Sequence, residues 1–202
     1  MAELTILNKL VQTDEMFGLE GWKREPVTKK LQIPDKIIQE IFPAQNEEIC
    51  ITAFVGDEPV GHCDNNSWQD FLEMFPKNLE RLENHDDQNV KNFVNLLKQV
   101  YEAEYTMLVP YLKEQGFTLD QVAHCSGLMV MQYHCNKGIG KKLIEFNDNF
   151  LRQKGYKVVV AEATNEISRK IFENNGYEED SYVDLQEIGI EDRYSVMFKI
   201  LV

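Results

Sequence analysis

The residues with the clearest chemical signal form a turn between an apolar run and a predicted helix. Leu128-Met129-Val130 leads into the turn-rich stretch 135–138, and a helix is predicted to begin at Ile139 with Gly140 in its first turn. The first N–H groups of a helix have no acceptor within the helix, and the positive end of the helix dipole lies there. A helix that begins through glycines therefore suits a phosphate or pyrophosphate group.

Basic residues gather around this turn although the whole chain is acidic. The 202 residues contain 21 basic and 34 acidic side chains, a formal net charge of −13, whereas the segment 135–157 contains six basic and two acidic ones. An acidic surface repels a phosphate backbone, so we expect no nucleic-acid partner. A cationic helix start on an acidic protein favours one specific anionic ligand. The alternative is a tight turn with solvated lysines and no ligand.

Two common phosphate-binding motifs do not fit the turn. A Walker A loop requires glycine where Cys135 stands and serine or threonine where Lys142 stands. The dinucleotide-binding fingerprint requires a third glycine where Leu143 stands. We therefore expect the turn to bind a different ligand that carries phosphate.

The same segment resembles the cofactor-binding signature of the GNAT superfamily of N-acetyltransferases. That signature is a strand reading Leu-x-Val, then Arg or Gln, two residues, Gly, one residue, and Gly or Ala. Leu128, Val130, Gly138 and Gly140 match it in register, and Cys135 replaces the Arg or Gln. The replacement removes one side-chain contact with pyrophosphate and leaves the backbone contacts intact.

A second signature of the superfamily also matches. It is Asn, two residues, a small residue, three residues, an aromatic residue, three residues, Gly and an aromatic residue, and here it is Asn165, Ser168, Phe172, Gly176 and Tyr177. The resemblance implies that acetyl-CoA is the co-substrate. Its pyrophosphate would lie on the backbone of 136–141 and its pantetheine arm along 128–130. The residues assigned to acetyl-CoA are Leu128, Met129, Val130, Asn136, Lys137, Gly138, Ile139, Gly140, Lys141, Asn165 and Phe172.

Phe172 is a departure that bears on mechanism. Many members have a tyrosine there that protonates the departing thiolate, and phenylalanine has no proton to give. The chain is most similar to the invertebrate arylalkylamine N-acetyltransferases, which use hydroxyl residues instead and carry an early Glu-Pro pair, here Glu25-Pro26. The resemblance implies that Glu25 takes a proton from the amine, directly or through water. It implies that Ser168, with Thr164 nearby, donates to the thiolate or orders a water that does.

The expected activity is transfer of an acetyl group to a small primary arylalkylamine by direct attack. Three alternatives stay open. The acceptor could be another small amine or a polyamine, or it could be a protein lysine. The domain could also bind acyl-CoA as a sensor without turnover, which the missing Arg or Gln and the missing tyrosine permit.

The cysteines and histidines predict neither a metal site nor a nucleophile. Three His-Cys pairs occur, at 62–63, 124–125 and 134–135. Adjacent residues on a strand point to opposite faces, so such pairs do not hold zinc. Four cysteines without a visible secretory signal predict reduced thiols and a cytoplasmic location, and no apolar stretch is long enough to span a membrane. The oligomeric state stays open.

The resemblance implies a single α/β domain over 1–202, with a mixed, mostly antiparallel and partly splayed sheet of the GNAT type flanked by helices. The pattern predicts strands at 4–10, 127–133, 156–163, 182–188 and 194–202, a hairpin of 48–55 and 60–63, and helices within 15–42, from 139 and over 165–174. A helical insertion is predicted around 64–116, kinked or ended at Pro110. The acidic run 178–180 is interpreted as a solvated edge, with attraction of cationic amines as the alternative. Aromatic side chains that could line a substrate pocket or pack in the core are Trp22, Trp68, Phe71, Phe75 and Tyr111.

Overall fold

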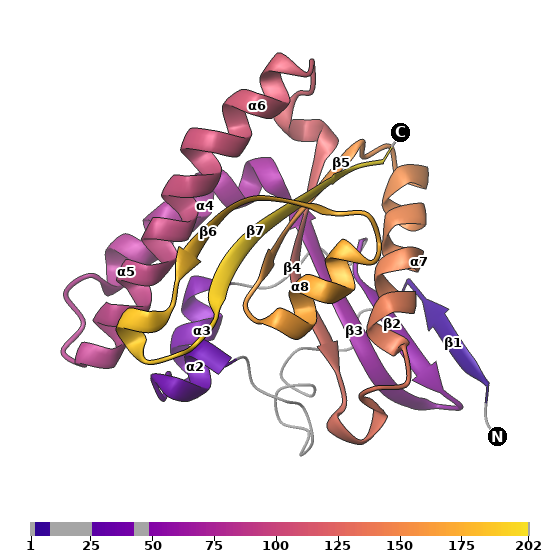
Figure 1. Cartoon of the computed structure of the whole chain (residues 1–202), viewed down its shortest axis with the longest axis horizontal. Coiled ribbons are helices and arrows are strands. Elements are labelled where there is room, and N and C mark those ends of the chain that lie inside the picture. The colour runs from indigo at the N-terminus through magenta and orange to yellow at the C-terminus, as the bar shows by residue number, and fades with distance from the viewer. Residues whose placement is uncertain (1–2, 9–25, 43–48, 202) are drawn as a thin grey trace.

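The computed structural model describes residues 3–8, 26–42 and 49–201, which form a seven-stranded sheet with helices on both faces (Figure 1). The strand order is β1-β2-β3-β4-β5-β7-β6, and every pairing is antiparallel except that of β4 with β5. This arrangement confirms the predicted mixed, mostly antiparallel sheet. The strands are β1 Leu4–Leu7, β2 Ile51–Val55, β3 Glu58–Ser67, β4 Val122–Val130, β5 Val158–Ala163, β6 Glu178–Asp184 and β7 Arg193–Ile200.

The longer helices begin after a capping residue, which is Ser67 for α4, Asp87 for α5 and Gly138 for α7. Pro26 opens α2, Pro34 precedes α3, and Asn165 caps α8. Among the described residues, no helix has both the length and the apolarity that crossing a bilayer requires. The helices are α2 Pro26–Lys30, α3 Asp35–Ile41, α4 Trp68–Leu82, α5 Gln88–Ala103, α6 Val109–Glu114, α7 Ile139–Gln153 and α8 Glu166–Glu173, with a π-helical turn at Glu104–Leu108 between α5 and α6.

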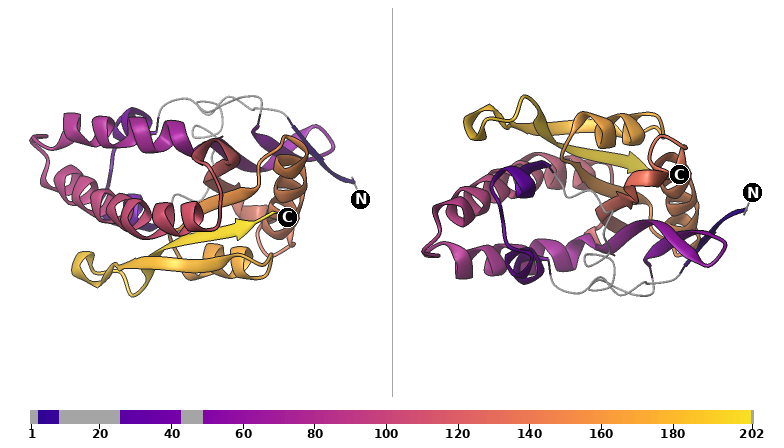
Figure 2. Two further views of the ribbon diagram at one scale, coloured as in Figure 1. Left: turned by 90° about the horizontal axis from the view of Figure 1, so that it is seen from above. Right: turned by 90° about the horizontal axis from the view of Figure 1, so that it is seen from below.

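Two hydrophobic cores cover the two faces of the sheet. Val158 and Val160 of β5 pack with α4, α5 and α6, whereas Val159 and Ala161 pack with α7 and α8. The figures show α4, α5 and α6 gathered on one side of the molecule and α7 on the other (Figures 1 and 2). Strand β5 is therefore buried on both faces, because successive side chains of a strand point to opposite faces.

Several predicted strand boundaries were wrong. Strand β3 continues to Ser67, which caps α4, so residues 64–67 are not helical. Strand β4 starts at Val122 and ends at Val130; its first four residues are all buried, so they lack the alternation that marks a half-exposed strand. Strand β6 covers 178–184 instead of 182–188, since this edge strand can include its acidic residues with one face in water.

Pro110 does not end the helical insertion. It lies in the first turn of α6, directly after the π-helical turn, where a residue without an N–H is tolerated. Strand β1 is shorter than predicted, since it ends at Leu7. The helical prediction for 15–25 lies outside the described residues.

The feature that positions the site is a splay between the two parallel strands. Strands β4 and β5 pair only from Val122 with Val158 to Cys125 with Ala161. Beyond that point β4 continues to Val130 paired with β3, and β5 continues paired with β7. Ser126 is an extra residue in β4, a bulge that bends the strand and increases its twist. The backbone of 126–130 therefore leaves its β5-facing side without a ladder partner.

Candidate active site

The start of α7 is a backbone cradle beside this splay. Asn136 has φ 61° and Gly138, the N-cap residue, has φ 77°, so the turn reverses through left-handed conformations. A side chain at Gly138 would meet no atom within 4 Å, so the turn faces open space. The exposed residues Asn136, Lys137 and Lys141 surround it. The N–H groups of this first turn have no intrahelical acceptor and are available to donate to an anion.

Gly140 has a different role from Gly138. An added Cβ at Gly140 would lie 3.0 Å from Cδ1 of Ile171 in α8 and 3.7 Å from Cγ2 of Val130. Glycine therefore lets α7 approach both α8 and the splayed end of β4. This contact brings the predicted pyrophosphate segment and the predicted pantetheine segment of 128–130 together. Ile139 is buried in the core, so only its backbone can reach a ligand.

Cys135 stabilises the turn from within. Its Sγ lies 3.8 Å from the carbonyl oxygen of Val130 and 3.5 Å from that of Met131, and the thiol donates to both. The residue that replaces Arg or Gln in the resembled signature thus contacts the protein's own backbone. The pyrophosphate site then depends on backbone N–H groups and on lysines.

Asn165 connects the other predicted site residues at the start of α8. Its side-chain oxygen accepts from the N–H groups of Ile167 and Ser168, at 2.9 and 3.0 Å. The Ser168 hydroxyl donates to the carbonyl of Asn165 at 2.9 Å, and Asn165 Nδ2 donates to Thr164 Oγ1 at 3.4 Å. The structure therefore brings Thr164, Asn165 and Ser168 together, with the Ser168 proton used in a helix cap.

Phe172 lies in the core. It is 2% exposed, and its ring centroid lies 4.9 Å from that of Tyr177. The Tyr177 hydroxyl donates to Asp148 at 2.7 Å. The contact of Phe172 with acetyl-CoA stays a prediction.

A buried acid–imidazole cluster, which sequence reasoning missed, lies at the mouth of the splay. We define it as His124 of β4, Glu162 of β5 and Glu104 of the π-helical turn. His124 Nε2 lies 2.7 and 2.9 Å from the two carboxylate oxygens of Glu162, and Trp68 Nε1 donates to Glu104 at 3.5 Å. Glu162 follows Ala161, the last β5 residue paired with β4. A glutamate inside the apolar strand 158–163 was the available sequence signal.

The two carboxyl groups of the cluster have opposite protonation tendencies. Burial, and then the charge of Glu162, raise the pKa of Glu104 well above its ordinary value. Burial alone would raise the pKa of Glu162 too, but the charge and hydrogen bond of His124 lower it below its ordinary value. Glu104 is therefore the neutral acid and Glu162 the anion paired with His124. Glu104 Oε1 and His124 Nδ1 are buried without a hydrogen-bond partner among the described residues.

Two of the aromatic side chains cover this cluster. The Phe71 ring contacts the His124 ring at a centroid distance of 4.0 Å and is tilted by 35° to it, and Trp68 is fully buried beside Glu104. Phe75 stacks on Phe71 at 4.5 Å, while Tyr111 lies farther along against Phe198. Trp22 and the predicted base Glu25 lie outside the described residues.

Two acidic residues near the C-terminus, Glu179 and Asp192, have arginine partners. A cavity of about 800 Å³ between α8 and the β6–β7 connection is lined by charged residues that include Arg169, Asp192 and Arg193. Arg169 pairs with Asp192 at 3.2 Å, and Arg193 pairs with Glu179 at 2.5 Å. These ion pairs neutralise Glu179 of the run 178–180 and Asp192, and the interpretation of the run as a solvated edge stays a prediction.

Comparisons with known proteins agree with this geometry. The model of the acetyltransferase (GNAT) family matches residues 12–177. Comparison with curated protein sequences gives no match. The fold is similar to arylalkylamine N-acetyltransferase 2 from Aedes aegypti, with 16% identity, a TM-score of 0.73 and coverage of 98% of this chain and 99% of that chain. It is also similar to the Drosophila melanogaster polyamine N-acetyltransferase, with 14% identity, a TM-score of 0.70 and coverage of 98% and 100%.

The family match covers more than half of the chain and includes the β4 splay, the α7 start and α8. The solved structures share the same fold over nearly their whole length. The chain belongs to the acetyltransferase (GNAT) family.

Proposed function

We propose that the protein moves an acetyl group from acetyl-CoA to a small primary amine with an aromatic or apolar tail. The observation that carries the proposal is the β4–β5 splay, which has a backbone anion cradle at one end and the acid–imidazole cluster at its mouth. The structural neighbours include an arylalkylamine N-acetyltransferase, which supports this substrate class.

Acetyl-CoA would be held mainly by the backbone. Its pyrophosphate would accept from the N–H groups of 136–141, with Lys137 and Lys141 supplying positive charge. Its pantetheine arm would pair with the free side of 126–130, as an added strand does at a sheet edge. An N–H group of that segment would polarise the thioester carbonyl and stabilise the developing oxyanion.

The amine must lose a proton before it attacks, because primary amines are mostly protonated at neutral pH. We propose Glu25 as the acceptor of that proton. The acid–imidazole cluster offers a second place for it, at the ionised carboxylate of Glu162. The cluster would take the proton through water, since His124 itself is buried.

The departing thiolate requires a proton from another group. Ser168 uses its proton in the helix cap, so it would have to exchange that acceptor for the thiolate. Thr164 accepts from Asn165, a contact that does not use its own proton. We therefore propose Thr164 as donor beside Ser168, either directly or through an ordered water.

We also propose a single domain over 1–202, and a cytoplasmic location, because all four cysteines are free thiols.

A coupled thiol-release assay with a panel of acceptors tests this function. Phenethylamine-type amines should be acetylated faster than agmatine, polyamines or lysine peptides at equal concentration. Faster reaction with agmatine or polyamines would contradict the proposed arylalkylamine class and favour a polyamine acceptor. Faster reaction with lysine peptides would favour a protein acceptor. Binding of acetyl-CoA without thiol release from any acceptor would favour the sensor.

A further inference from the structure

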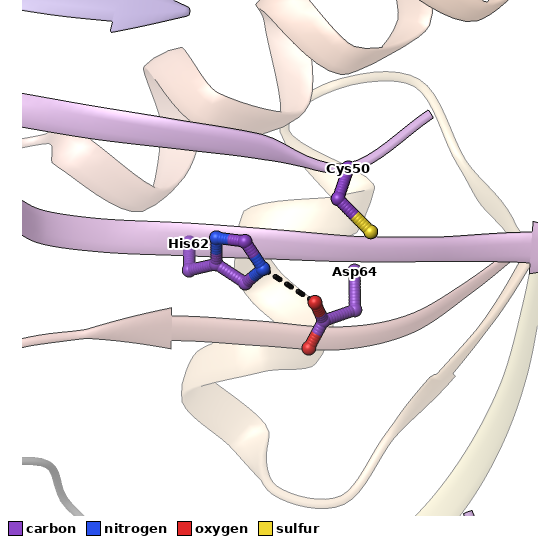
Figure 3. A group of neighbouring side chains, drawn as sticks. All are labelled: Cys50, His62 and Asp64. Atoms are coloured by element: carbon purple, nitrogen blue, oxygen red, sulfur yellow. Dashed lines mark hydrogen bonds and ion pairs between the residues drawn. The ribbon is translucent and has the colours of Figure 1, made fainter. Parts of the chain in front are cut away.

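Three side chains that commonly bind metals lie together on one face of β2 and β3. They are Cys50, next to the start of β2, and His62 and Asp64 of β3, which share a face because they are two residues apart. Their potential ligand atoms all lie within 4.8 Å of one another, and all three side chains are buried. Figure 3 shows the His62 ring and the Asp64 carboxylate in contact, with the Cys50 thiol directed toward them.

We propose that Cys50, His62 and Asp64 bind a divalent transition metal of the zinc class. A sulfur, an imidazole nitrogen and a carboxylate oxygen are the three donor types that zinc uses in proteins. Magnesium and calcium prefer oxygen ligands alone, so a cysteine and a histidine select against them. Three protein ligands leave one tetrahedral position for water.

The distances require only small side-chain movements. Tetrahedral zinc with its usual bond lengths places ligand atoms about 3.3 to 3.6 Å apart. His62 Nε2 and Asp64 Oδ1 are 2.5 Å apart, so the metal must separate them by about 0.8 Å. No two of the potential ligand atoms are more than 4.8 Å apart, so a pair at that distance would have to approach by about 1.2 Å. Side-chain rotations on two rigid strands can supply both changes.

Thr52 provides the outer contact that a metal-bound histidine needs. Its Oγ1 lies 2.7 Å from His62 Nδ1, the ring nitrogen opposite the one that faces Asp64. When the metal takes Nε2, the ring proton moves to Nδ1 and is donated to Thr52 Oγ1. Cys50 gives its proton to solvent as the sulfur–metal bond forms. The thiol holds that proton in the metal-free protein, since burial, and then the charge of Asp64, raise its pKa to about 12.

This site differs from the His-Cys pairs of the sequence. His62 and Cys63 do point to opposite faces, since Cys63 Sγ lies 3.4 Å from Cys125 Sγ in the other core. The proposed ligand set instead joins residues from two neighbouring strands, which spacing along the chain does not reveal. The prediction of no metal was based only on His and Cys residues that are adjacent in sequence.

The metal would fasten the start of β2 to β3 beside the splay. Asp64 Oδ2 lies 3.0 Å from the position that a Cβ on Gly127 would occupy, so the site borders the backbone proposed to hold pantetheine. No step of acetyl transfer passes through it. The proposal therefore stands or fails independently of the proposed function, and its test uses no activity measurement.

Cobalt titration of the full-length, chelator-treated protein tests the site. One equivalent of Co²⁺ should produce a sulfur-to-cobalt charge-transfer band and the visible bands of tetrahedral cobalt, and Zn²⁺ should abolish both. Cys50→Ala should remove the charge-transfer band and lower zinc affinity by about 100-fold or more, and Thr52→Val should lower it by about 10- to 100-fold. Cys63→Ala is the matched control, because it removes a buried thiol from the face of β3 opposite His62 and Asp64. It should leave zinc affinity unchanged.

The proposal is overturned if wild-type protein gives no charge-transfer band, or if Cys50→Ala gives the same band as wild type. X-ray absorption of the zinc-loaded wild type does not depend on any variant's folding. It should find one sulfur ligand with nitrogen and oxygen ligands, and a site with oxygen ligands alone would refute the assignment.

Discussion

Replacement of Glu104 by glutamine tests the protonation assigned to the acid–imidazole cluster. Glu104 is fully buried, and burial together with the neighbouring Glu162 raises its pKa well above the ordinary value of 4.5. The native state thus keeps a proton that the unfolded chain releases above pH 4.5, so rising pH favours the unfolded state. One such proton lowers the free energy of unfolding by about 1.4 kcal/mol per pH unit between the two pKa values.

Glu104→Gln removes this titration and keeps a neutral group that can donate to Glu162. The wild type should therefore lose stability relative to Glu104→Gln as pH rises from about 5, and the gap should widen until the native pKa of Glu104 is passed. Urea unfolding at several pH values measures both curves, with the exposed Glu102→Gln as the matched control. Parallel curves for the wild type and Glu104→Gln would refute a protonated Glu104.

The other predictions concern the predicted site residues. Gly140→Val should lower the free energy of unfolding by about 1 to 3 kcal/mol, since its Cβ would lie 3.0 Å from Ile171. It should also weaken acetyl-CoA binding measured by calorimetry, and unchanged affinity would contradict the placement of the pyrophosphate. Ser168→Ala should lower the free energy of unfolding by about 0.5 to 2 kcal/mol through the lost cap contacts. If Ser168 also protonates the thiolate, the loss of turnover should be smaller for thioesters with better leaving thiols. Glu25→Gln should reduce turnover by about 10- to 1000-fold with similar acetyl-CoA affinity. The loss of turnover should become smaller as pH rises, because the amine then deprotonates unaided. A pH–rate profile that matches wild type would leave Glu25 with a structural role only.

Much of the fold could be predicted because local signals and tertiary packing agree. The strand predicted at 156–163 has an almost wholly apolar centre and is buried on both faces, and Asn165 and Gly176 lie at the two ends of α8. Predictions were wrong where tertiary context decides. Residues 122–125 show no alternation of buried and exposed side chains, because β4 is a central strand. Residues 64–67 continue β3, because the next helix begins only after its cap Ser67.

The cofactor segment was predictable because its parts are contiguous in sequence. The turn 135–141 and the strand end 128–130 carry their own spacing, and the structure brings them together through Gly140. Sites assembled from distant segments were not predictable. His124 meets Glu104 and Glu162 only after α5, β4 and β5 pack, and Cys50 meets His62 only after β2 pairs with β3.

Backbone amide NMR with acetyl-CoA tests the central claim most directly. The claim is that acetyl-CoA lies in the β4–β5 splay with its pyrophosphate on the α7 start. Titration of labelled protein with acetyl-CoA should shift the amide signals of 136–141 and 126–130 most strongly, and those of the cavity near Asp192 least. Largest shifts around that cavity, with the signals of 136–141 unmoved, would contradict the account.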